Sequence, residues 1–417
     1  MSHDVACYFF SFEVSLSSSS VLIFATSSKL LVTRSRYPIP RNIILSHQTL
    51  SDPYAFSSAC HNRVSLKMDT TLYPKITNRI KEVLHTLSHD TNPSSLSEAV
   101  RKLSLSEATE QLPLVGTVKL HGTHADILIY PNDDAIVLQS RNCLNISTQA
   151  DNHGFAAAMQ YKSKNVVRLR DRYYARYKEL NHDTQIDPNR ALIIAGEWIG
   201  EKIQKGVALV HLSRRFVIIS VNINGQWLPD EDYADIHDEE AEIYNISRAG
   251  FYHAILDKSD VEKTEQELEK LAEDVAVSCP FAATFGVAGK GEGIVWKIKS
   301  YCSDPRTWFK TKGGKFKPTY TPTPREGPPA DDKLAEKKTM AVKFAEAWCS
   351  EQRLEQGWDY LREKGLSQDM KSIGIFLTWV TEDILVEEKW DIDKHEMDTK
   401  LLKADIIRIA KPWYLKQ

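Results

Sequence analysis

The chain has 417 residues, which is too long for one ordinary compact core and predicts two domains with flanking segments. Hydrophobic residues make up 42% and charged residues 26%, and no apolar run reaches the roughly 20 residues of a membrane-spanning helix, which argues against a transmembrane protein. The formal net charge of -3 does not by itself indicate a nucleic-acid-binding protein, although a net charge can conceal a local basic cluster.

The first 67 residues differ in composition from the rest. They are rich in serine and poor in acids, with scattered arginine and lysine, which fits a mitochondrial transit peptide. An over-extended gene model fits equally well, because Met68 is followed at once by a plausible globular start. The six cysteines show no close pairing that predicts a zinc site or a redox pair, so a reducing compartment is expected. The location expected is the cytoplasm, or the mitochondrion if residues 1–67 are a real transit peptide.

Residues 68–317 are predicted to form one α+β domain of antiparallel sheets with flanking helices. Apolar residues recur at helical spacing at 76–87 and again at 97–103. Short runs rich in valine, isoleucine and leucine, separated by turn residues, then predict strands. The strand-like segments lie within 114–141, 191–200, 216–224 and 293–300, and the helical insertions lie at 155–180 and 261–277.

A second domain is predicted after a linker at 318–332. The linker has five prolines between Pro318 and Pro329 and few large apolar residues. Beyond it, apolar residues fall repeatedly at helical spacing, as in Met340, Phe344 and Trp348. Residues 333–417 are therefore expected to be a small all-helical domain.

One ordered series of short motifs carries the chemistry. Lys119-Leu120-His121-Gly122 alone is a weak signal, because a lysine three residues before a glycine is frequent by chance. The motifs that follow it in order are Ser140-Arg141, Gly196-Glu197-Trp198-Ile199-Gly200, Arg215-Phe216, Glu292-Gly293-Ile294-Val295-Trp296-Lys297 and Lys310-Thr311-Lys312-Gly313. Over roughly residues 110–315 this series resembles the covalent nucleotidyltransferase superfamily of ligases and capping enzymes. Within it, the closest resemblance is to RNA ligases of the phage nick-sealing and trypanosome editing type, which implies a nucleotidyltransferase (ATP-grasp-like ligase) domain.

The resemblance implies a role for each motif residue. Lys119 would be the nucleophile that forms a covalent lysyl-AMP, and Gly122 would belong to the nucleotide-binding site. Arg141 would assist in binding a phosphate or a strand end, Glu197 would bind the AMP ribose, and Phe216 would stack on adenine. An acid inside the apolar run at 191–199 is costly to bury without a partner, which supports the role of Glu197, although a salt bridge to Lys202 or to a neighbouring strand is the structural alternative.

The same resemblance makes Glu292 a catalytic and metal-supporting residue and makes Lys310 and Lys312 contacts of the α-phosphate. A lysine attacks phosphorus only as the neutral amine, whereas a free lysine is almost wholly protonated at neutral pH. Burial and two nearby ammonium groups would both disfavour the charged form of Lys119. Side chains two apart share a strand face, so Lys310 and Lys312 have the required spacing. Because pyrophosphate is a highly charged leaving group, Mg²⁺ is expected as a cofactor beside ATP, with Glu292 as its best ligand.

Other charged segments leave alternatives open. Between residues 290 and 317 lysine and arginine outnumber the acids and alternate with Trp296, Trp308 and Phe309, which predicts a surface that grips and stacks on nucleic acid. The arginines of 154–180 suit either phosphate contacts or a solvated helix face, and the acidic run at 230–242 is expected to be a solvated loop. His124 stands where many relatives carry asparagine, which leaves the recognition of strand ends open.

The function expected is that of an ATP-dependent RNA ligase. Lys119 would attack ATP, AMP would pass to a 5'-phosphate end, and a 3'-hydroxyl would then displace AMP. A DNA ligase or capping enzyme would continue into a β-rich barrel, whereas this chain continues into helices that would grip the nucleic acid. The expected partners are RNA ends, nicked or single-stranded, with no membrane, and the expected state is a monomer. The rival readings are another covalent nucleotidyltransferase or a non-catalytic nucleic-acid-binding relative.

Overall fold

The computed structural model describes residues 10–16, 19–26, 29–32, 73–89, 110–317 and 333–417. The chain divides into two compact units, Met1–Ser65 and Leu66–Gln417. The first unit contains an antiparallel sheet of β1 (Phe10–Leu16), β2 (Ser19–Thr26) and β3 (Lys29–Val32). The helix predicted at 97–103 and the linker predicted at 318–332 lie outside the described residues.

The larger sheet of the second unit runs in the order β10-β8-β7-β5-β6, with β9 paired to β8. Its strands are β5 (Thr123–Ile129), β6 (Ile136–Ser140), β7 (Leu192–Ile199), β8 (Arg215–Ile223), β9 (Gln226–Trp227) and β10 (Ile243–Asn245). All pairs are antiparallel except β10 with β8, which is parallel. The strands predicted from the apolar runs are confirmed, whereas β10 is too short for its three residues to form such a run.

A smaller antiparallel sheet has the order β11-β4-β12-β13. It comprises β4 (Gln111–Lys119), β11 (Tyr252–Asp257), β12 (Gly293–Ile298) and β13 (Trp308–Lys312). Gly293 lies opposite Lys119 on one side and opposite Lys312 on the other. This register brings the end of β4 to the same edge of the sheet as the start of β12 and the end of β13, which lie more than 170 residues later in the sequence.

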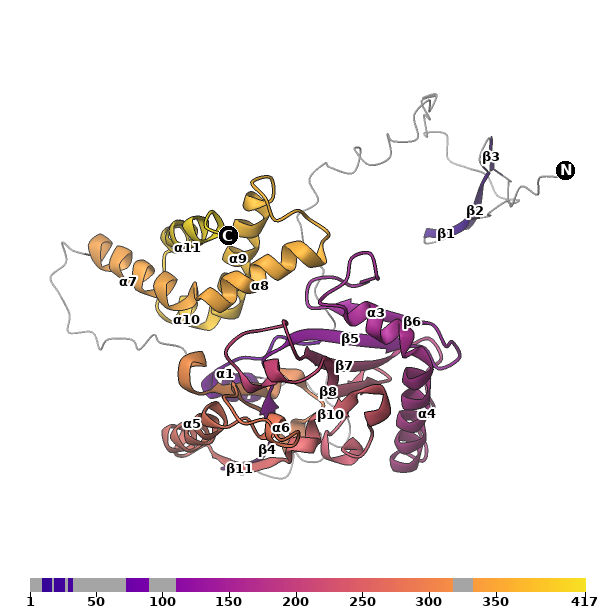
Figure 1. Cartoon of the computed structure of the whole chain (residues 1–417), viewed down its shortest axis with the longest axis horizontal. Helices are drawn as coiled ribbons and strands as arrows, with labels where there is room; N and C mark the ends of the chain where they lie inside the picture. Colours follow the sequence, from indigo (N-terminus) through magenta and orange to yellow (C-terminus); the bar gives the residue numbers. More distant parts are fainter. Residues whose placement is uncertain (1–9, 17–18, 27–28, 33–72, 90–109, 318–332) are drawn as a thin grey trace. The chain divides into compact units, whose positions relative to one another are not determined.

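Helices cover both sheets (Figure 1). The predicted helix at 155–180 is two helices, α3 (Phe155–Tyr161) and α4 (Ser163–Leu180), and their apolar side chains share a core with β5, β7 and β8. The helix predicted at 261–277 is confirmed as α5 (Val261–Val277), which packs on β11, β12 and β13, while α6 (Pro280–Ala283) follows it. The first helical pattern forms α1 (Ile80–His89), which begins later than the spacing predicted because Thr77 joins a bridge to β13.

The C-terminal region is helical, as predicted. It consists of α7 (Lys333–Trp348), α8 (Glu351–Glu363), α9 (Ile373–Glu387), α10 (Lys389–Lys394) and α11 (Thr399–Tyr414). Its buried apolar residues, among them Phe344, Leu361 and Phe376, form a core drawn only from residues 340–414. We call this region the helical domain. Among the described residues, no helix is long and apolar enough to cross a membrane.

Candidate active site

The ends of β4, β12 and β13 bring two lysines and one glutamate together. The Lys119 Nζ lies 2.8 Å from Glu292 Oε2, and the Lys312 Nζ lies 3.0 Å from Glu292 Oε1. The Glu292 side chain is only 3% exposed, whereas the two lysines are about a quarter exposed, so they are reachable from the cleft. Burial raises the pKa of Glu292, but the ammonium groups of Lys119 and Lys312 outweigh it and hold that pKa well below its usual range.

His121 adds a third contact to the same carboxylate. Its Nδ1 lies 3.2 Å from Glu292 Oε2, its Nε2 lies 3.1 Å from Gln352 Nε2 on α8, and its ring meets the ring of Phe316 edge-on. Gln352 thereby links the helical domain to the group that holds Lys119. The sequence marked His121 only as part of the lysine motif, not as a partner of Glu292.

Glu197 and Gly122 fix each other at the next strand of the larger sheet. The Gly122 backbone N–H donates to Glu197 Oε1 at 2.9 Å, so Gly122 is the hydrogen-bond partner of Glu197, and not the Lys202 considered from the sequence. A Cβ on Gly122 would lie 2.5 Å from the carbonyl oxygen of Trp198, which only glycine avoids. Burial raises the pKa of Glu197, against the opposing effects of Lys119 and His124. A carboxylate has further acceptor capacity, which suits the hydroxyl pair of a ribose.

Lys310 and Arg141 lie across the cleft from α9 of the helical domain. Arg141 Nη2 donates to Glu387 Oε1 at 3.3 Å. Desolvation lowers the pKa of Lys310 to about 8, assisted by the charges of Lys312, Lys119 and Arg141 and opposed by Glu387. Lys310 is therefore mostly positively charged below about pH 8 and mostly neutral above it.

All of these side chains line one cleft of about 510 Å³, a size typical of sites for cofactors and other small ligands. Its floor comes from β4, β5, β7, β8, β12 and β13, and its roof comes from α8 and α9. Four cations, Lys119, Arg141, Lys310 and Lys312, and the carboxylate of Glu197 give it the donors and acceptor that a nucleotide requires. The residues present therefore fit ATP or AMP.

A metal ion does not fit the cleft in the same way. Both oxygens of Glu292 are engaged by ammonium groups, so a cation at Glu292 would have to displace a lysine. Within the part of the chain that the structure describes, no group of three or more His, Cys, Asp and Glu residues is placed to hold a metal. The prediction of a Mg²⁺ ligand at Glu292 thus gains no support from its surroundings.

A comparison with known protein families finds a match to the part of the chain that contains this site. The family model described as RNA ligase matches residues 112–312, a range that contains Lys119, Glu292 and Lys312. This part of the chain is similar to the RNA ligase family. We call the part that contains this match, residues 73–317, the ligase domain.

Solved structures similar to this chain include several of one ligase. The structure of Naegleria gruberi RNA ligase with PPi is 17% identical, has a TM-score of 0.31, and is matched over 52% of this chain and 53% of that one. A mutant of that ligase with ATP and Mn is 16% identical, with a TM-score of 0.30 and coverage of 62% and 67%. The chain thus spans about half the length of the first of these structures, and at such values the likeness carries no conclusion about activity. No curated protein matches the chain.

The structure corrects the predicted position of Phe216. Its ring is fully buried, meets the ring of Phe155 with centroids 5.5 Å apart, and lies across Gly196, where a Cβ would come within 2.3 Å of it. Because side chains alternate along β8, Ile219 instead of Phe216 reaches the cleft. The apolar contact available to a base on β8 is therefore Ile219, and the prediction that Phe216 stacks on adenine is wrong for this conformation.

The aromatic residues of the predicted basic surface are also core residues. Trp296, Trp308 and Phe309 are all fully buried, so the prediction that they stack on bases is wrong. Lys297 is 5% exposed, pairs with Asp230 at 2.7 Å, and lies 4.0 Å from the centroid of the Trp308 ring. Residues 290–317 contain both basic and aromatic residues because the side chains of β12 and β13 point alternately into the cleft and into the core.

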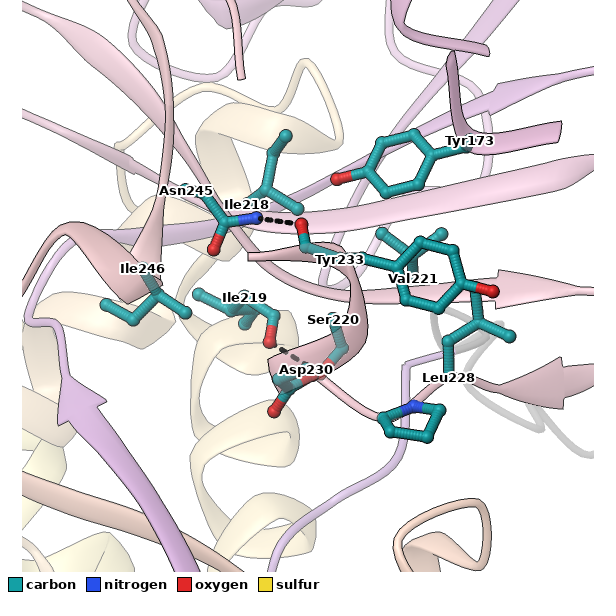
Figure 2. Close-up of a pocket in the computed structure, with 11 residues that line it drawn as sticks. Tyr173, Ile218, Ile219, Ser220, Val221, Leu228, Asp230, Tyr233, Asn245 and Ile246 are labelled. Carbon is teal, nitrogen blue, oxygen red and sulfur yellow. Dashed lines mark hydrogen bonds between the residues drawn. The ribbon is translucent and has the colours of Figure 1, made fainter. Parts of the chain in front are cut away.

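The acidic run at 230–242 is only partly a solvated loop. Asp230, beside Lys297, belongs to a cavity of about 20 Å³ whose lining also includes Tyr173, Ser220 and Asn245 (Figure 2). A cavity of this volume has room for about one water molecule. Farther along, the α4 arginines hold the acidic run in place, since Arg172 donates to the carbonyl oxygens of residues 235 and 237 and Arg176 pairs with Asp235 at 3.1 Å. These intramolecular contacts explain the charges of the α4 arginines and of the acidic run without requiring a bound nucleic acid.

His124 has a defined place in the ligase domain. Its ring stacks on Tyr73 with centroids 4.8 Å apart, and its Nε2 lies 2.9 Å from Asp126 Oδ1. Both His124 and Tyr73 line the cleft. Tyr73 was not among the predicted site residues, because nothing near it in the sequence resembles a motif of the family.

Proposed function

We propose that this chain is an ATP-dependent RNA ligase that joins 3'-hydroxyl and 5'-phosphate ends through a lysyl-AMP on Lys119. The observation that carries the proposal is the convergence of Lys119 and Lys312 on Glu292, in a cleft that also presents Lys310, Arg141 and Glu197. The match of residues 112–312 to the RNA ligase family supports the choice of reaction.

In the first step the Lys119 amine attacks the α-phosphorus of ATP. A P–N bond forms, the bond between the α-phosphorus and the bridging oxygen breaks, and pyrophosphate leaves. The amine must lose its proton before it attacks. Glu292 holds Lys119 at the cleft floor, while Lys312 and Lys310 offer positive charge to the phosphate oxygens on which negative charge accumulates.

In the later steps the AMP passes from Lys119 to a 5'-phosphate, and a 3'-hydroxyl then displaces AMP to form the phosphodiester. The P–N bond breaks in the first of these transfers, which returns Lys119 to its free state. Arg141, which lines the cleft and faces Glu387 of α9, is proposed to bind the strand end. Because the cleft residues that the structure describes offer no metal site of their own, Mg²⁺ would enter only together with the phosphates of ATP, where it would neutralise charge on the leaving group.

Labelling with nucleotide tests the proposal directly. The purified protein is incubated with ATP or with GTP, each labelled at the α-phosphate, and the acid-labile label on the protein is measured. We expect labelling by ATP and not by GTP, followed by loss of the label when a nicked RNA duplex with a 5'-phosphate is added and sealed. Labelling by GTP without ATP would favour a capping enzyme, and no labelling by either would favour a non-catalytic relative.

The preference for RNA over DNA needs a separate measurement. The labelled protein is chased with nicked duplexes of identical sequence in which the two strands at the nick are RNA or DNA. We expect sealing of the RNA nick to be faster. Equal or faster sealing of the all-DNA nick would place the chain with DNA ligases instead.

A further inference from the structure

The contact between the ligase domain and the helical domain is polar. Each of the hydrophobic clusters draws its residues from one domain alone, with the cluster of the helical domain confined to 340–414. Hydrogen bonds and ion pairs connect the two instead. Surfaces that associate permanently are usually more apolar, whereas polar contacts characterise surfaces that separate and meet again.

The charges across this contact have opposite signs. The ligase domain contributes mainly cations and the helical domain contributes carboxylates, in the pairs Lys75–Asp383, Arg79–Asp391, Arg141–Glu387 and Lys205–Glu355. Among the residues that the helical domain adds to the cleft lining are one arginine, Arg353, and four carboxylates, Asp359, Glu363, Asp383 and Glu387. We call Glu355, Glu363, Asp383 and Glu387 the acidic face.

Glu363 occupies hydrogen-bond donors of the ligase domain that could otherwise bind the phosphates of an RNA strand. Ser140 Oγ and Asn142 Nδ2 donate to Glu363 Oε2 at 2.9 Å and 3.1 Å, and Asn152 Nδ2 donates to Oε1 at 2.9 Å. Hydroxyl and amide donors of this kind are common partners of phosphate oxygens in nucleic-acid complexes. Burial raises the pKa of Glu363, against the hydrogen bonds from Ser140 and Asn142, so the carboxylate loses solvation on entering this position.

The acidic face is held in shape from within the helical domain. Arg353 lies 2.9 Å from Glu387, 3.2 Å from Glu388 and 3.5 Å from Asp383. These contacts join α8 to α9 without any residue of the ligase domain. The α9 part of the face, Asp383 and Glu387, therefore keeps its arrangement if the two domains separate, as a reversible contact requires.

We propose that the acidic face imitates the phosphates of a polynucleotide, so that the helical domain and the substrate strand compete for the same donors on the ligase domain. The inference rests on the proposed function only in naming the polynucleotide as the ligase's substrate. It replaces the expectation that this domain grips nucleic acid, because carboxylates facing the cleft repel phosphates. Displacement of the helical domain accompanies strand binding, while ATP binding to the cleft floor does not require it.

Cross-linking of the full chain tests the competition. A carbodiimide joins an amine to a carboxylate in contact with it, and the exposed pair Lys205–Glu355, with Nζ and Oε1 3.0 Å apart, reports the contact between domains. The pair Lys389–Asp393, within α10, is the internal control. A 20-nucleotide RNA with a 5'-hydroxyl is added at saturating concentration without ATP, and cross-linked peptides are quantified by mass spectrometry. We expect the Lys205–Glu355 cross-link to fall at least about threefold while the control stays constant.

A charge variant provides an independent measurement. The double substitution Glu355→Gln, Glu387→Gln is compared with Asp393→Asn, Asp405→Asn, which removes the same charge from residues paired with Lys389 and Arg408 of the helical domain. We expect the first variant to bind the RNA about fivefold more tightly than wild type and the second to bind it unchanged.

Two results would overturn the competition. The first is a negative cross-linking experiment, in which the Lys205–Glu355 cross-link persists at saturating RNA or the RNA does not bind the protein. The other is weaker or equal RNA binding by the acidic-face variant, which would mean that the domain assists the strand. Neither measurement uses ATP, so a failure of nucleotide labelling would remove the proposed function and leave this test intact.

Discussion

The floor and the roof of the cleft are built by different means. The floor consists of adjacent strands, where hydrogen-bonded register sets Lys119 and Lys312 on either side of Gly293. The roof consists of two helices of a separately packed domain, held to the floor by ion pairs such as Arg141–Glu387. Backbone pairing fixes the floor regardless of charge, whereas the roof depends on charge and is sensitive to pH, salt and competing anions.

The largest expected effect comes from the centre of the floor. Replacing Glu292 by glutamine removes the carboxylate that holds both Lys119 and Lys312, and leaves two ammonium groups close together without it. We expect lysyl-AMP formation to fall by at least about 100-fold. The matched control is Glu269→Gln, an exposed glutamate paired with Lys317. Labelling by Glu292→Gln within a few fold of wild type would contradict the role given to the floor.

A smaller effect is expected on the pH dependence of adenylylation, because Glu387 of the roof acts on the charge of Lys310 in the floor. The pKa of Lys310 is about 8, so its charge is present below that pH and lost as the pH rises through it. If this charge assists the transfer, kcat/KM for adenylylation declines above about pH 8. Glu387 raises the pKa of Lys310, so Glu387→Gln moves the decline to lower pH, and Lys310→Arg moves it to much higher pH. A pH profile identical in all three proteins would show that the roof does not act on Lys310.

The two faces of β8 give a comparison within the floor itself. Phe216→Leu changes the core face, and we expect it to lower the free energy of unfolding by about 1–3 kcal/mol with the KM for ATP unchanged. Ile219→Ala changes the cleft face, and we expect the KM for ATP to rise about tenfold. Chemical denaturation and adenylylation kinetics measure the two effects. An increase in KM caused by Phe216→Leu alone would restore the adenine-stacking role predicted from the sequence.

The smallest effect is expected at the edge of the roof. Lys205 is 85% exposed and, within the described part of the chain, forms an ion pair with Glu355 of α8, so its charge is well screened. Lys205→Ala should change the free energy of unfolding by less than about 1 kcal/mol. A larger loss, measured by thermal or chemical unfolding, would mean that the two domains depend on each other for stability and would blur the difference between floor and roof.

The floor was largely predictable from the sequence because its chemistry is local. The resemblance of its ordered motifs to those of RNA ligases, together with the alternation that puts Lys310 and Lys312 on one strand face, was enough to propose Lys119, Glu292, Lys310 and Lys312 as one site. The resemblance gave the wrong face for Phe216, and alternation could not correct it, since Phe216, Val217, Ile218 and Ile219 are all apolar and neither face is marked as core. The register between β7 and β8 also shifts between Ala195, opposite Ser220, and Gly196, opposite Ile218, so that Ile219 is an extra residue of β8, and no composition signal predicts this bulge.

The roof could not be predicted, for a physical reason. Glu363 and Glu387 lie on helices that carry several other acids, and nothing in the local sequence distinguishes them from acids such as Glu351 and Glu382. Their partners, Ser140 and Arg141, lie more than two hundred residues earlier, so the pairs exist only after the two domains meet. The pair of Gln352 and His121 likewise forms only after the two domains meet. Strand motifs predict chemistry within one sheet, whereas complementary charges between domains need a structure.

The most direct test of the account is the identity of the nucleotide-bearing residue. Wild type, Lys119→Ala and the control Lys299→Ala, whose lysine pairs with Glu231, are incubated with ATP labelled at the α-phosphate. Adenylylated peptides are then mapped by mass spectrometry. We expect one AMP on Lys119 in wild type and in the control, and no labelled protein for Lys119→Ala. Undiminished labelling of Lys119→Ala, or AMP mapped to another lysine of wild type, would contradict the account.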